Sequence, residues 1–454
     1  MLCISMSLVD DNSLMYFYWL NVATQHCVFS SMSLEDDYEY IDGHNGRCLA
    51  AALCFFALSS KKKRKGYKGS VPGRRPNKRN VPEGGWRLNR DYFDANCVFP
   101  ETIFRRRYRM RKQVFERIEQ GLLSYNKDYW EQGQDATGML GYTTKQKITA
   151  ALRMLCYGKP ADSFDVELGM SGSAIQVAFD HFTHDIVQIY GKEYMRKPNQ
   201  QDLNWLLEVA EQRGFPGMLG SLDCMHWVWE SCPSGWKGQY IGHQGEPTII
   251  LEAVAGPDRW IWHCNFGAPG SLNDINVLHR SPLFDDLISG NAPNIEFTVN
   301  GNTYHMGYYL TDGIYPEWAT LVKGIPLPRA PKDQLFSEKV AMYRKDVECA
   351  FGILQKKFAI VKGPARNWFG AIMRNIMETC VILHNMTVED ERRLGLRHDY
   401  NQGSRVQALP RNEPTIELMI EKRNQIINKP AHRQLQADLI QHVWAKYGHT
   451  FQPR

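Results

Sequence analysis

The chain is 43% hydrophobic and 23% charged, which is typical of globular protein. Its length of 454 residues is sufficient for roughly two to four domain cores. Its formal net charge of +5 is too small by itself to indicate a polyanionic partner. Eleven cysteines without a CxxC spacing exclude a zinc ribbon and a disulfide framework, and the longest apolar run is about half the roughly 20 residues of a membrane helix. We therefore expect free thiols and no membrane span.

The first 89 residues divide into two segments of different composition. Residues 1–60 combine an apolar start, the acidic patch SLEDDYEY and a short apolar run, and we assign them no role. Residues 61–89 begin with KKKRKGYKGSVPGRRPNKR, which holds ten Lys or Arg and no acid. Such a cluster predicts an exposed basic linker that acts as a nuclear import signal and also binds DNA phosphates, with a solvated charge run as the plain alternative.

Residues 90–204 are predicted to form an all-helical, DNA-binding domain. The arginine-rich stretch FRRRYRMRKQVFERIEQGL has apolar residues at helical spacing, so one face packs while another stays basic. The basic residues expected to neutralise DNA phosphates are Arg105, Arg106, Arg107, Arg109, Arg111 and Lys112. The next segment, TTKQKITAALRMLCYG, opens on a Thr cap and continues the helical pattern.

The end of this domain has the form of a helix-turn-helix. Asp162–Leu168 is the short first helix, Gly169–Ser171 the turn, and a second helix continues to about Tyr190. This second helix is expected to enter the major groove of DNA and read its bases. An ordinary helical hairpin is the alternative, because the second helix carries few basic residues. His181 and His184 are three apart on it, but without a third ligand nearby they are better interpreted as surface or core histidines than as a zinc site.

Residues 205–390 change to the pattern of an α/β domain. Four runs of β-branched, aromatic and aliphatic residues bounded by Gly or Pro predict buried strands of one sheet. These runs are GMLGSLDCMHWVWE, PTIILEAVAG, RWIWHCNFGAPG and MGYYLTDGIYP. Helical stretches lie between and after them, which indicates helices packed on a sheet. Residues 391–454 have the pattern of a polar tail with a last helical piece near Leu435–Tyr447.

Three carboxylates of this domain are the candidate catalytic residues. Asp223 lies inside a predicted strand, where a buried charge is costly unless a cation or partner offsets it. Asp312 ends another strand run, at the carboxyl end where α/β sheets bind ligands. Glu348 flanks the apolar stripe of the longest helix and can reach the same pocket. Simpler alternatives exist, since Glu348 can pair with Arg344 one turn earlier and Asp312 can form a turn before Gly313.

Such a set of carboxylates suits a hard cation. Mg²⁺ is held by few protein carboxylates and completes its coordination with water and phosphate oxygens. Two Mg²⁺ or Mn²⁺ ions about 4 Å apart, held by Asp223, Asp312 and Glu348, would activate water or a 3′ hydroxyl and stabilise the leaving oxygen of a phosphodiester. The sequence therefore predicts a two-metal site. Asp274 in PGSLNDINVL is a further candidate, although this motif is also typical of a helix start.

Long segments between about Gly69 and Met386 resemble the plant PIF/Harbinger transposase domain. In chain order they include GSVPGRRPNKRN, DYFDANCVFPETIFRRRYRM, GSLDCMHWVWESCPSGWKGQY, WIWHCNFGAPGSLNDINVLHRSPLF, MGYYLTDGIYPEWATLVKGI, RKDVECAFGILQKKFAIVKGPARNWF and VILHNM. Matched by motif, the family's two catalytic Asp and its Glu fall on Asp223, Asp312 and Glu348.

The resemblance implies an RNase H-like fold with a DDE active site, and a nuclear enzyme that excises and integrates a DNA transposon. It also implies double-stranded DNA as substrate, a Myb/SANT-like accessory protein and self-association, since two transposon ends must meet. The alternative is a domesticated descendant that acts as a chromatin or transcription adaptor without cleaving DNA. Two residues depart from the family pattern, Cys349 in place of Arg and Leu272 in place of His, and we expect them to weaken DNA contact rather than metal binding.

Overall fold

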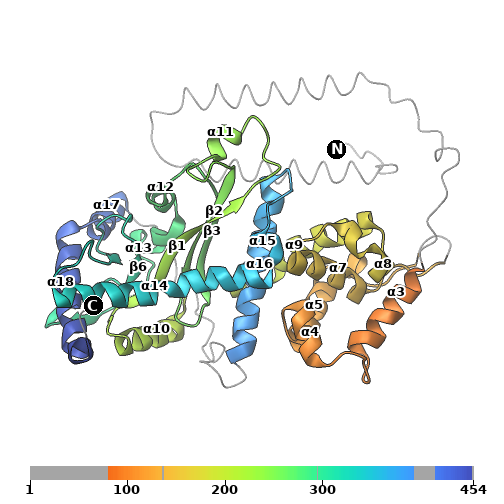
Figure 1. Cartoon of the computed structure of the whole chain (residues 1–454), viewed down its shortest axis with the longest axis horizontal. Coiled ribbons are helices and arrows are strands. Elements are labelled where there is room, and N and C mark those ends of the chain that lie inside the picture. Colours follow the sequence, from red (N-terminus) through yellow and green to blue (C-terminus); the bar gives the residue numbers. More distant parts are fainter. Residues whose placement is uncertain (1–79, 135–137, 294, 393–414, 452–454) are drawn as a thin grey trace, which may run out of the picture. The chain divides into compact units, whose positions relative to one another are not determined.

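The computed structural model places a helical region before a central β-sheet, which confirms the predicted mixed α/β class (Figure 1). It describes residues 80–134, 138–293, 295–392 and 415–451, all within the compact unit Lys78–Arg454. The predicted import signal in residues 61–79 lies outside the described residues, as does the segment 1–60. Among the described residues the cysteines are free thiols, and no helix is both long and apolar enough to cross a membrane.

The helical region follows the predicted apolar periodicity, with one break. Its elements are α3 (Val81–Leu88), η1 (Asn89–Phe93), α4 (Glu101–Tyr108), α5 (Lys112–Tyr125), α6 (Lys127–Trp130), α7 (Thr144–Tyr157), η2 (Ala161–Phe164), α8 (Asp165–Leu168), α9 (Gly172–Tyr194) and α10 (Gln200–Gln212). The arginine-rich stretch forms two helices, because Arg109 takes a φ of 60° and ends α4. Thr143 and Gln146 form a capping box that begins α7.

A short helical arm, a turn and a long helix are present where the helix-turn-helix pattern predicts them. Gly169 has a φ of 63° in the turn, and the Ser171 side chain accepts a hydrogen bond from the backbone N–H of Ala174 to cap α9. The helix ends at Tyr194, one turn later than predicted. α9 packs against α5, α7 and α16, so it is the central helix of this region.

The central sheet has five strands in the order β3-β2-β1-β6-β7. Their bounds are β1 (Met218–Val228), β2 (Thr248–Ala255), β3 (Ile261–Pro269), β6 (Tyr308–Thr311) and β7 (Leu321–Lys323), and β4 (Phe297–Val299) pairs with β5 (Asn302–Tyr304) in a separate ribbon. β1, β2 and β3 are antiparallel, whereas β6 and β7 run parallel to β1. The four predicted strand runs are all in this sheet. β7 was not predicted, because three residues are too few to show a strand pattern.

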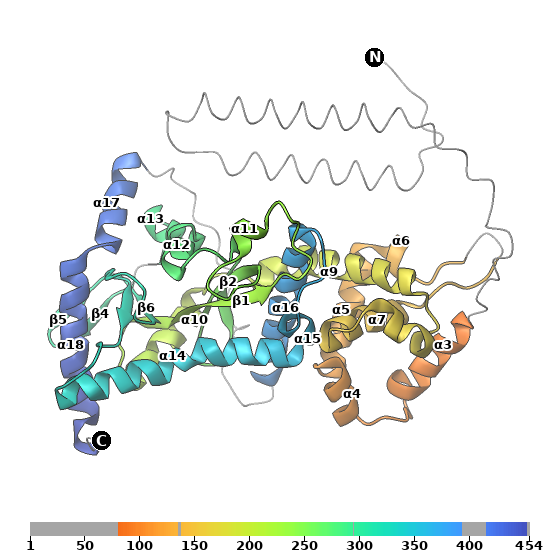
Figure 2. The same cartoon turned by 45° about the horizontal axis from the view of Figure 1, so that its top comes forward.

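Helices cover both faces of the sheet. The helical elements between and after the strands are α11 (Lys237–Tyr240), α12 (Asp274–His279), η3 (Pro282–Phe284), α13 (Asp285–Ile288), α14 (Pro331–Lys357), α15 (Ala359–Lys362), α16 (Gly370–Glu391), α17 (Ile416–Ile426), α18 (Lys429–Tyr447) and η5 (Gly448–Thr450). α14 packs on β1, β2 and β6, with α18 at one of its ends and α15 at the other (Figures 1 and 2). α12, η3 and α17 contribute to the core on the other face of β1.

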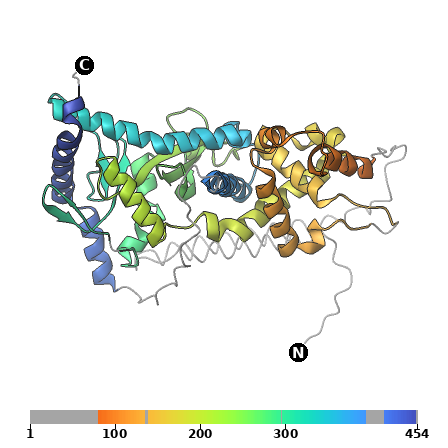
Figure 3. The ribbon, with the colours of Figure 1, turned by 90° about the horizontal axis from the view of Figure 1, so that it is seen from below.

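The last helix belongs to the core of the sheet region. Leu435, Leu439 and Val443 of α18 are buried and pack with Phe336 and Val340 of α14. Figure 3 shows α18 crossing the end of α14. Leu435, Leu439 and Val443 are four residues apart and form one narrow apolar stripe among polar neighbours. The segment therefore has the composition of a polar tail although it packs in the core.

His384 on α16 makes the fold sensitive to acid. Its side chain is fully buried, and burial, aided by the charge of Lys357, lowers the pKa of the imidazole from 6.5 to about 3. Nε2 lies 2.8 Å from the carbonyl oxygen of Arg259, to which the neutral ring donates. Between pH 6.5 and 3 the unfolded chain therefore binds a proton that the folded chain does not, and the free energy of unfolding falls as the pH falls.

We expect His384→Gln to remove this part of the acid sensitivity. Between pH 6.5 and 5 the wild type should lose about 2 kcal/mol of unfolding free energy that the variant keeps. Urea denaturation at a series of pH values measures both curves. Parallel curves for the two proteins would show that His384 is protonated in the folded state.

Candidate active site

The site is built on the neighbouring strands β1 and β6, whose register depends on a bulge at Gly220. Met218 pairs with Tyr308, but Gly220 pairs with Tyr309, so β1 has one residue more than β6 over this stretch. Gly220 has a φ of 152°, and a Cβ on it would lie 2.7 Å from the carbonyl oxygen of Ala255. A side chain at this position would force the strands apart, and the glycine therefore preserves the shifted register.

The shifted register brings two of the predicted carboxylates side by side. Beyond the bulge Ser221 pairs with Leu310, and two residues further along both chains are Asp223 and Asp312, which directly follows β6. Ser221 donates a hydrogen bond to the carbonyl oxygen of Tyr343 on α14, so this face of β1 is the one that α14 covers. Because alternate strand residues share a face, Asp223 also points toward α14.

Burial and neighbouring charges together determine the pKa of the Asp223 carboxyl group. Its side chain is 17% exposed, and burial raises the pKa of its carboxyl group from 3.8 to about 6. The backbone N–H of Cys224 and the guanidinium of Arg344 oppose this rise in pKa, whereas the carboxylates of Asp312 and Asp274 add to it. A carboxylate in this environment is stabilised by a nearby cation.

Glu348 is connected to Asp223 through Arg344. Nη2 of Arg344 lies 2.6 Å from Oε1 of Glu348, and Nη1 lies 3.3 Å from Oδ2 of Asp223. The simple i,i+4 pair on α14 is thus present, but the same guanidinium also reaches the strand. Sequence patterns indicate the first contact, since the two residues are one helical turn apart, and carry no signal for the second.

Asp312 also makes the turn contact that its sequence context suggests. Its Oδ1 accepts a hydrogen bond from the backbone N–H of Ile314 at 3.0 Å. This contact orients the carboxylate at the end of β6, beside Asp223. A turn-forming role and a place in the acidic site are therefore compatible for this residue.

The three carboxylates fit a divalent cation in charge and donor chemistry. Oxygen donors are the ligands that Mg²⁺ and Mn²⁺ prefer, and a cationic group, the Arg344 guanidinium, already lies between Asp223 and Glu348. In the described part of the chain, however, no three Asp, Glu, His or Cys side chains are close enough to hold a metal ion. The structure brings Asp223 and Asp312 together and connects Glu348 to them only through Arg344.

Asp274, the further candidate, contacts the opposite face of β1. It begins α12 directly after the cap residue Asn273, as the helix-start interpretation predicts. It forms a hydrogen bond with Cys224, whose thiol also lies 3.5 Å from the hydroxyl of Tyr315, and burial raises the pKa of the Asp274 carboxyl group. Since Cys224 and Asp223 are consecutive strand residues, their side chains point to opposite faces.

Part of the arginine cluster in α4 and α5 pairs with the acidic end of α16. These ion pairs are Arg105–Glu391 at 2.7 Å, Arg111–Asp390 at 3.6 Å and Arg117–Glu389 at 3.1 Å. Of the six basic residues predicted to contact phosphates, Arg105 and Arg106 are exposed and the other four are partly buried. The surface that remains for DNA is therefore smaller than the composition indicates.

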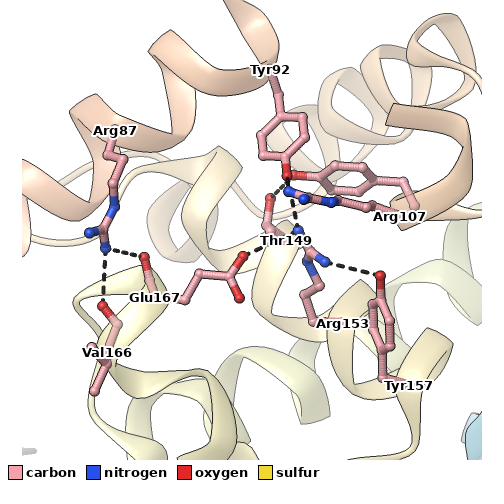
Figure 4. A network of polar contacts seen from close by, with 9 residues as sticks. Arg87, Tyr92, Arg107, Thr149, Arg153, Tyr157, Val166 and Glu167 are labelled. Carbon is pink, nitrogen blue, oxygen red and sulfur yellow. Dashed lines mark hydrogen bonds and ion pairs between the residues drawn. The ribbon is translucent and has the colours of Figure 1, made fainter. Parts of the chain in front are cut away.

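Other arginines of the helical region hold its helices together, as Figure 4 shows. Arg87 on α3 donates to the backbone carbonyls of Val166 and Glu167, and Arg153 on α7 lies 3.3 Å from the Glu167 carboxylate. Arg107 donates to the hydroxyl of Tyr92, which also lies 3.5 Å from Nη2 of Arg153. Buried or half-buried in this network, these side chains stabilise the packing of α3, α4, α7 and α8.

The proposed reading helix α9 carries no Lys or Arg before Lys192. His181 stacks on the ring of Tyr129 with 3.8 Å between the ring centroids, and Nδ1 of His184 lies 2.9 Å from the Asp185 carboxylate. These contacts agree with ordinary surface or core histidines. The helical-hairpin interpretation is favoured by the charge of this helix, and DNA reading by α9 stays a prediction.

The segment that contains the three candidate carboxylates matches a known protein family. Residues 192–395 match the family model described as plant transposon protein, and residues 84–122 match a domain of unknown function (DUF8418). The chain is similar to "Protein ALP1-like" of Arabidopsis thaliana, at 25% identity over an alignment of 284 residues that covers 57% of this chain and 66% of that protein. It is also similar to "Putative nuclease HARBI1" of Bos taurus, at 22% identity over 178 residues, which are 39% of this chain and 47% of that protein.

These similarities are partial. The chain spans less than two thirds of the length of either curated relative. No solved structure matches the chain significantly. All three candidate carboxylates lie inside the matched residues 192–395.

Proposed function

Because this chain belongs to the Harbinger-type, transposase-derived proteins, we propose that it is a divalent-metal-dependent DNA nuclease that acts as a transposase on a PIF/Harbinger-type element. The observation that carries the proposal is the position of Asp223 on β1 and of Asp312 directly after the parallel strand β6, with Glu348 on the helix α14 that packs on β1. The relative that is named a putative nuclease supports the same chemistry.

We further propose that the sheet has an RNase H-like fold. Three antiparallel strands come first in the chain and two strands parallel to β1 follow, in the spatial order β3-β2-β1-β6-β7. The acidic residues lie in the middle of β1, directly after β6 and on the covering helix α14. This distribution over two strands and a helix is what the DDE resemblance predicts.

In the proposed mechanism the three carboxylates bind and orient the reacting groups. Mg²⁺ or Mn²⁺ would supply activation of the attacking oxygen and stabilisation of the leaving oxygen. Asp223, Asp312 and Glu348 would hold these ions. Water would attack phosphorus in line and the P–O3′ bond would break, which leaves a 5′ phosphate and a 3′ hydroxyl. This hydroxyl would then attack a phosphodiester of the target DNA, so that a new P–O bond forms and the 3′ hydroxyl of the target strand leaves.

The remaining assignments follow from the same function. The proposal includes nuclear entry through residues 61–79 and binding of double-stranded transposon ends. It also includes assistance by a Myb/SANT-like accessory protein and self-association. The second candidate, a domesticated chromatin or transcription adaptor, is favoured by one observation. Within the described residues the carboxylates do not converge to metal-ligand distance, since Arg344 lies between two of them.

A nicking assay separates the two candidates. We expect the purified full-length chain, supplied with the accessory protein, to nick a supercoiled plasmid that carries the genomic DNA flanking its gene when Mn²⁺ or Mg²⁺ is added. Ca²⁺ should support DNA binding but little cleavage, because its looser coordination misaligns the attacking oxygen. Conversion to the open-circular form on a gel measures the reaction. DNA binding without nicking in either Mn²⁺ or Mg²⁺ would reject the nuclease and favour the adaptor.

A further inference from the structure

Arg344 lies where two of the predicted metal ligands would meet. Its guanidinium contacts Oε1 of Glu348 at 2.6 Å and Oδ2 of Asp223 at 3.3 Å. The side chains of Asp223, Arg344 and Glu348 are 17%, 26% and 42% exposed, so the group is accessible from solvent on the side of Glu348. One cation thus spans an acid of the strand and an acid of the helix.

An i,i+4 ion pair that only stabilises a helix does not need the second contact. Such a pair stabilises the helix through its two helical partners alone. Arg344 in addition crosses to β1, and it separates carboxylates that a metal ion would draw together. The same helix shows a purely structural arrangement at Asp346, a buried residue paired with Arg213 at 2.5 Å and Arg259 at 2.9 Å, which both come from other elements.

We propose that Arg344 is the internal counter-ion of the metal-free triad and competes with the divalent cation for Asp223 and Glu348. This inference rests on the proposed function, since it takes these residues as metal ligands. An arginine keeps its charge at any physiological pH, so it leaves the carboxylates only when another cation replaces it. Because the Arg344 side chain is 26% exposed, a change of its rotamer toward solvent would release both acids without moving α14.

The test is a titration of the full-length protein with Mn²⁺ in the absence of DNA, followed by calorimetry and by thermal unfolding. We expect Arg344→Gln to lower the dissociation constant for Mn²⁺ by about threefold or more, because the ion no longer has to break two partly exposed ion pairs. The dissociation constant of Arg344→Lys for Mn²⁺ should lie between those of Arg344→Gln and the wild type. The reason is that an ammonium is a point charge that cannot pair with both carboxylates through a planar fork. Thermal stabilisation by Mn²⁺ should follow the same order.

Lys345→Gln is the matched control. It removes the same charge from the exposed neighbouring position on α14 and should shift the Mn²⁺ affinity by less than the Arg344 variants do. If Arg344 had only a structural role, its replacement would lower the melting temperature equally with and without Mn²⁺ and leave the dissociation constant unchanged.

The outcomes distinguish this inference from the proposed function. Wild-type binding of Mn²⁺ that is unchanged or weakened in both Arg344 variants overturns the inference and leaves the metal site standing. Binding by Arg344→Gln but not by the wild type supports it in the strongest form. No binding by any of the proteins overturns the metal site and the counter-ion role together. If Arg344→Gln does not fold, the comparison of Arg344→Lys with the wild type decides alone.

Discussion

Replacing Asp223, Asp312 or Glu348 by its amide should reduce DNA nicking by at least ~10³-fold, since each substitution removes a charge that the reaction requires and keeps the shape of the side chain. DNA binding should stay close to that of the wild type, because the expected phosphate contacts lie in the helical region. Initial nicking rates with Mn²⁺ and gel-shift binding with Ca²⁺ measure the two properties separately. Circular dichroism establishes that each variant is folded.

Asp274→Asn is the control for this series. Its carboxylate has a burial-raised pKa, as that of Asp223 does, but it contacts Cys224 on the other face of β1. We therefore expect less than a tenfold loss of nicking. Wild-type nicking by any one of the three amide variants would remove that residue from the triad. A loss at Asp274 as large as the others would mean that the site extends through the sheet.

Asp258→Asn should lower the free energy of unfolding by about 3–5 kcal/mol, the largest effect on stability that we predict. Asp258 forms an ion pair with Arg392, and their side chains are 3% and 1% exposed. The Arg392 guanidinium also lies over the ring of Trp260, 4.8 Å from its centroid. The substitution removes a charged partner from a buried guanidinium, and the loss of such a partner is costly because the guanidinium is desolvated. Urea denaturation measures the change.

The exposed pair between Glu230 and Arg366 is the matched comparison. Its atoms are 3.0 Å apart and the side chains are 55% and 68% exposed, so Glu230→Gln should cost less than about 1 kcal/mol. Adding Arg392→Met to Asp258→Asn should recover part of the loss, because it removes the buried charge. Equal destabilisation by Asp258→Asn and Glu230→Gln would contradict the argument from burial.

The amino-acid sequence alone was sufficient for features that depend on local pattern. Apolar periodicity placed α7, α9 and α14, a Thr cap marked the start of α7, and short β-branched and aromatic runs gave four of the five strands of the sheet. The candidate acids were found in the same way, because a carboxylate inside a strand or beside an apolar stripe stands out from its neighbours. These signals are local, since propensity, capping and burial act within a few residues of chain.

Tertiary structure decided the features that depend on partners distant in sequence. The bulge at Gly220 determines whether Asp312 falls beside Asp223, because a shift of one residue moves a side chain to the other face of a sheet. The acidic end of α16 neutralises part of an arginine cluster more than 270 residues earlier in the chain. Arg344 makes one contact of each kind. Its ion pair with Glu348 follows from helical spacing, which the sequence shows. Its contact with Asp223, 121 residues away, exists only because α14 packs across β1.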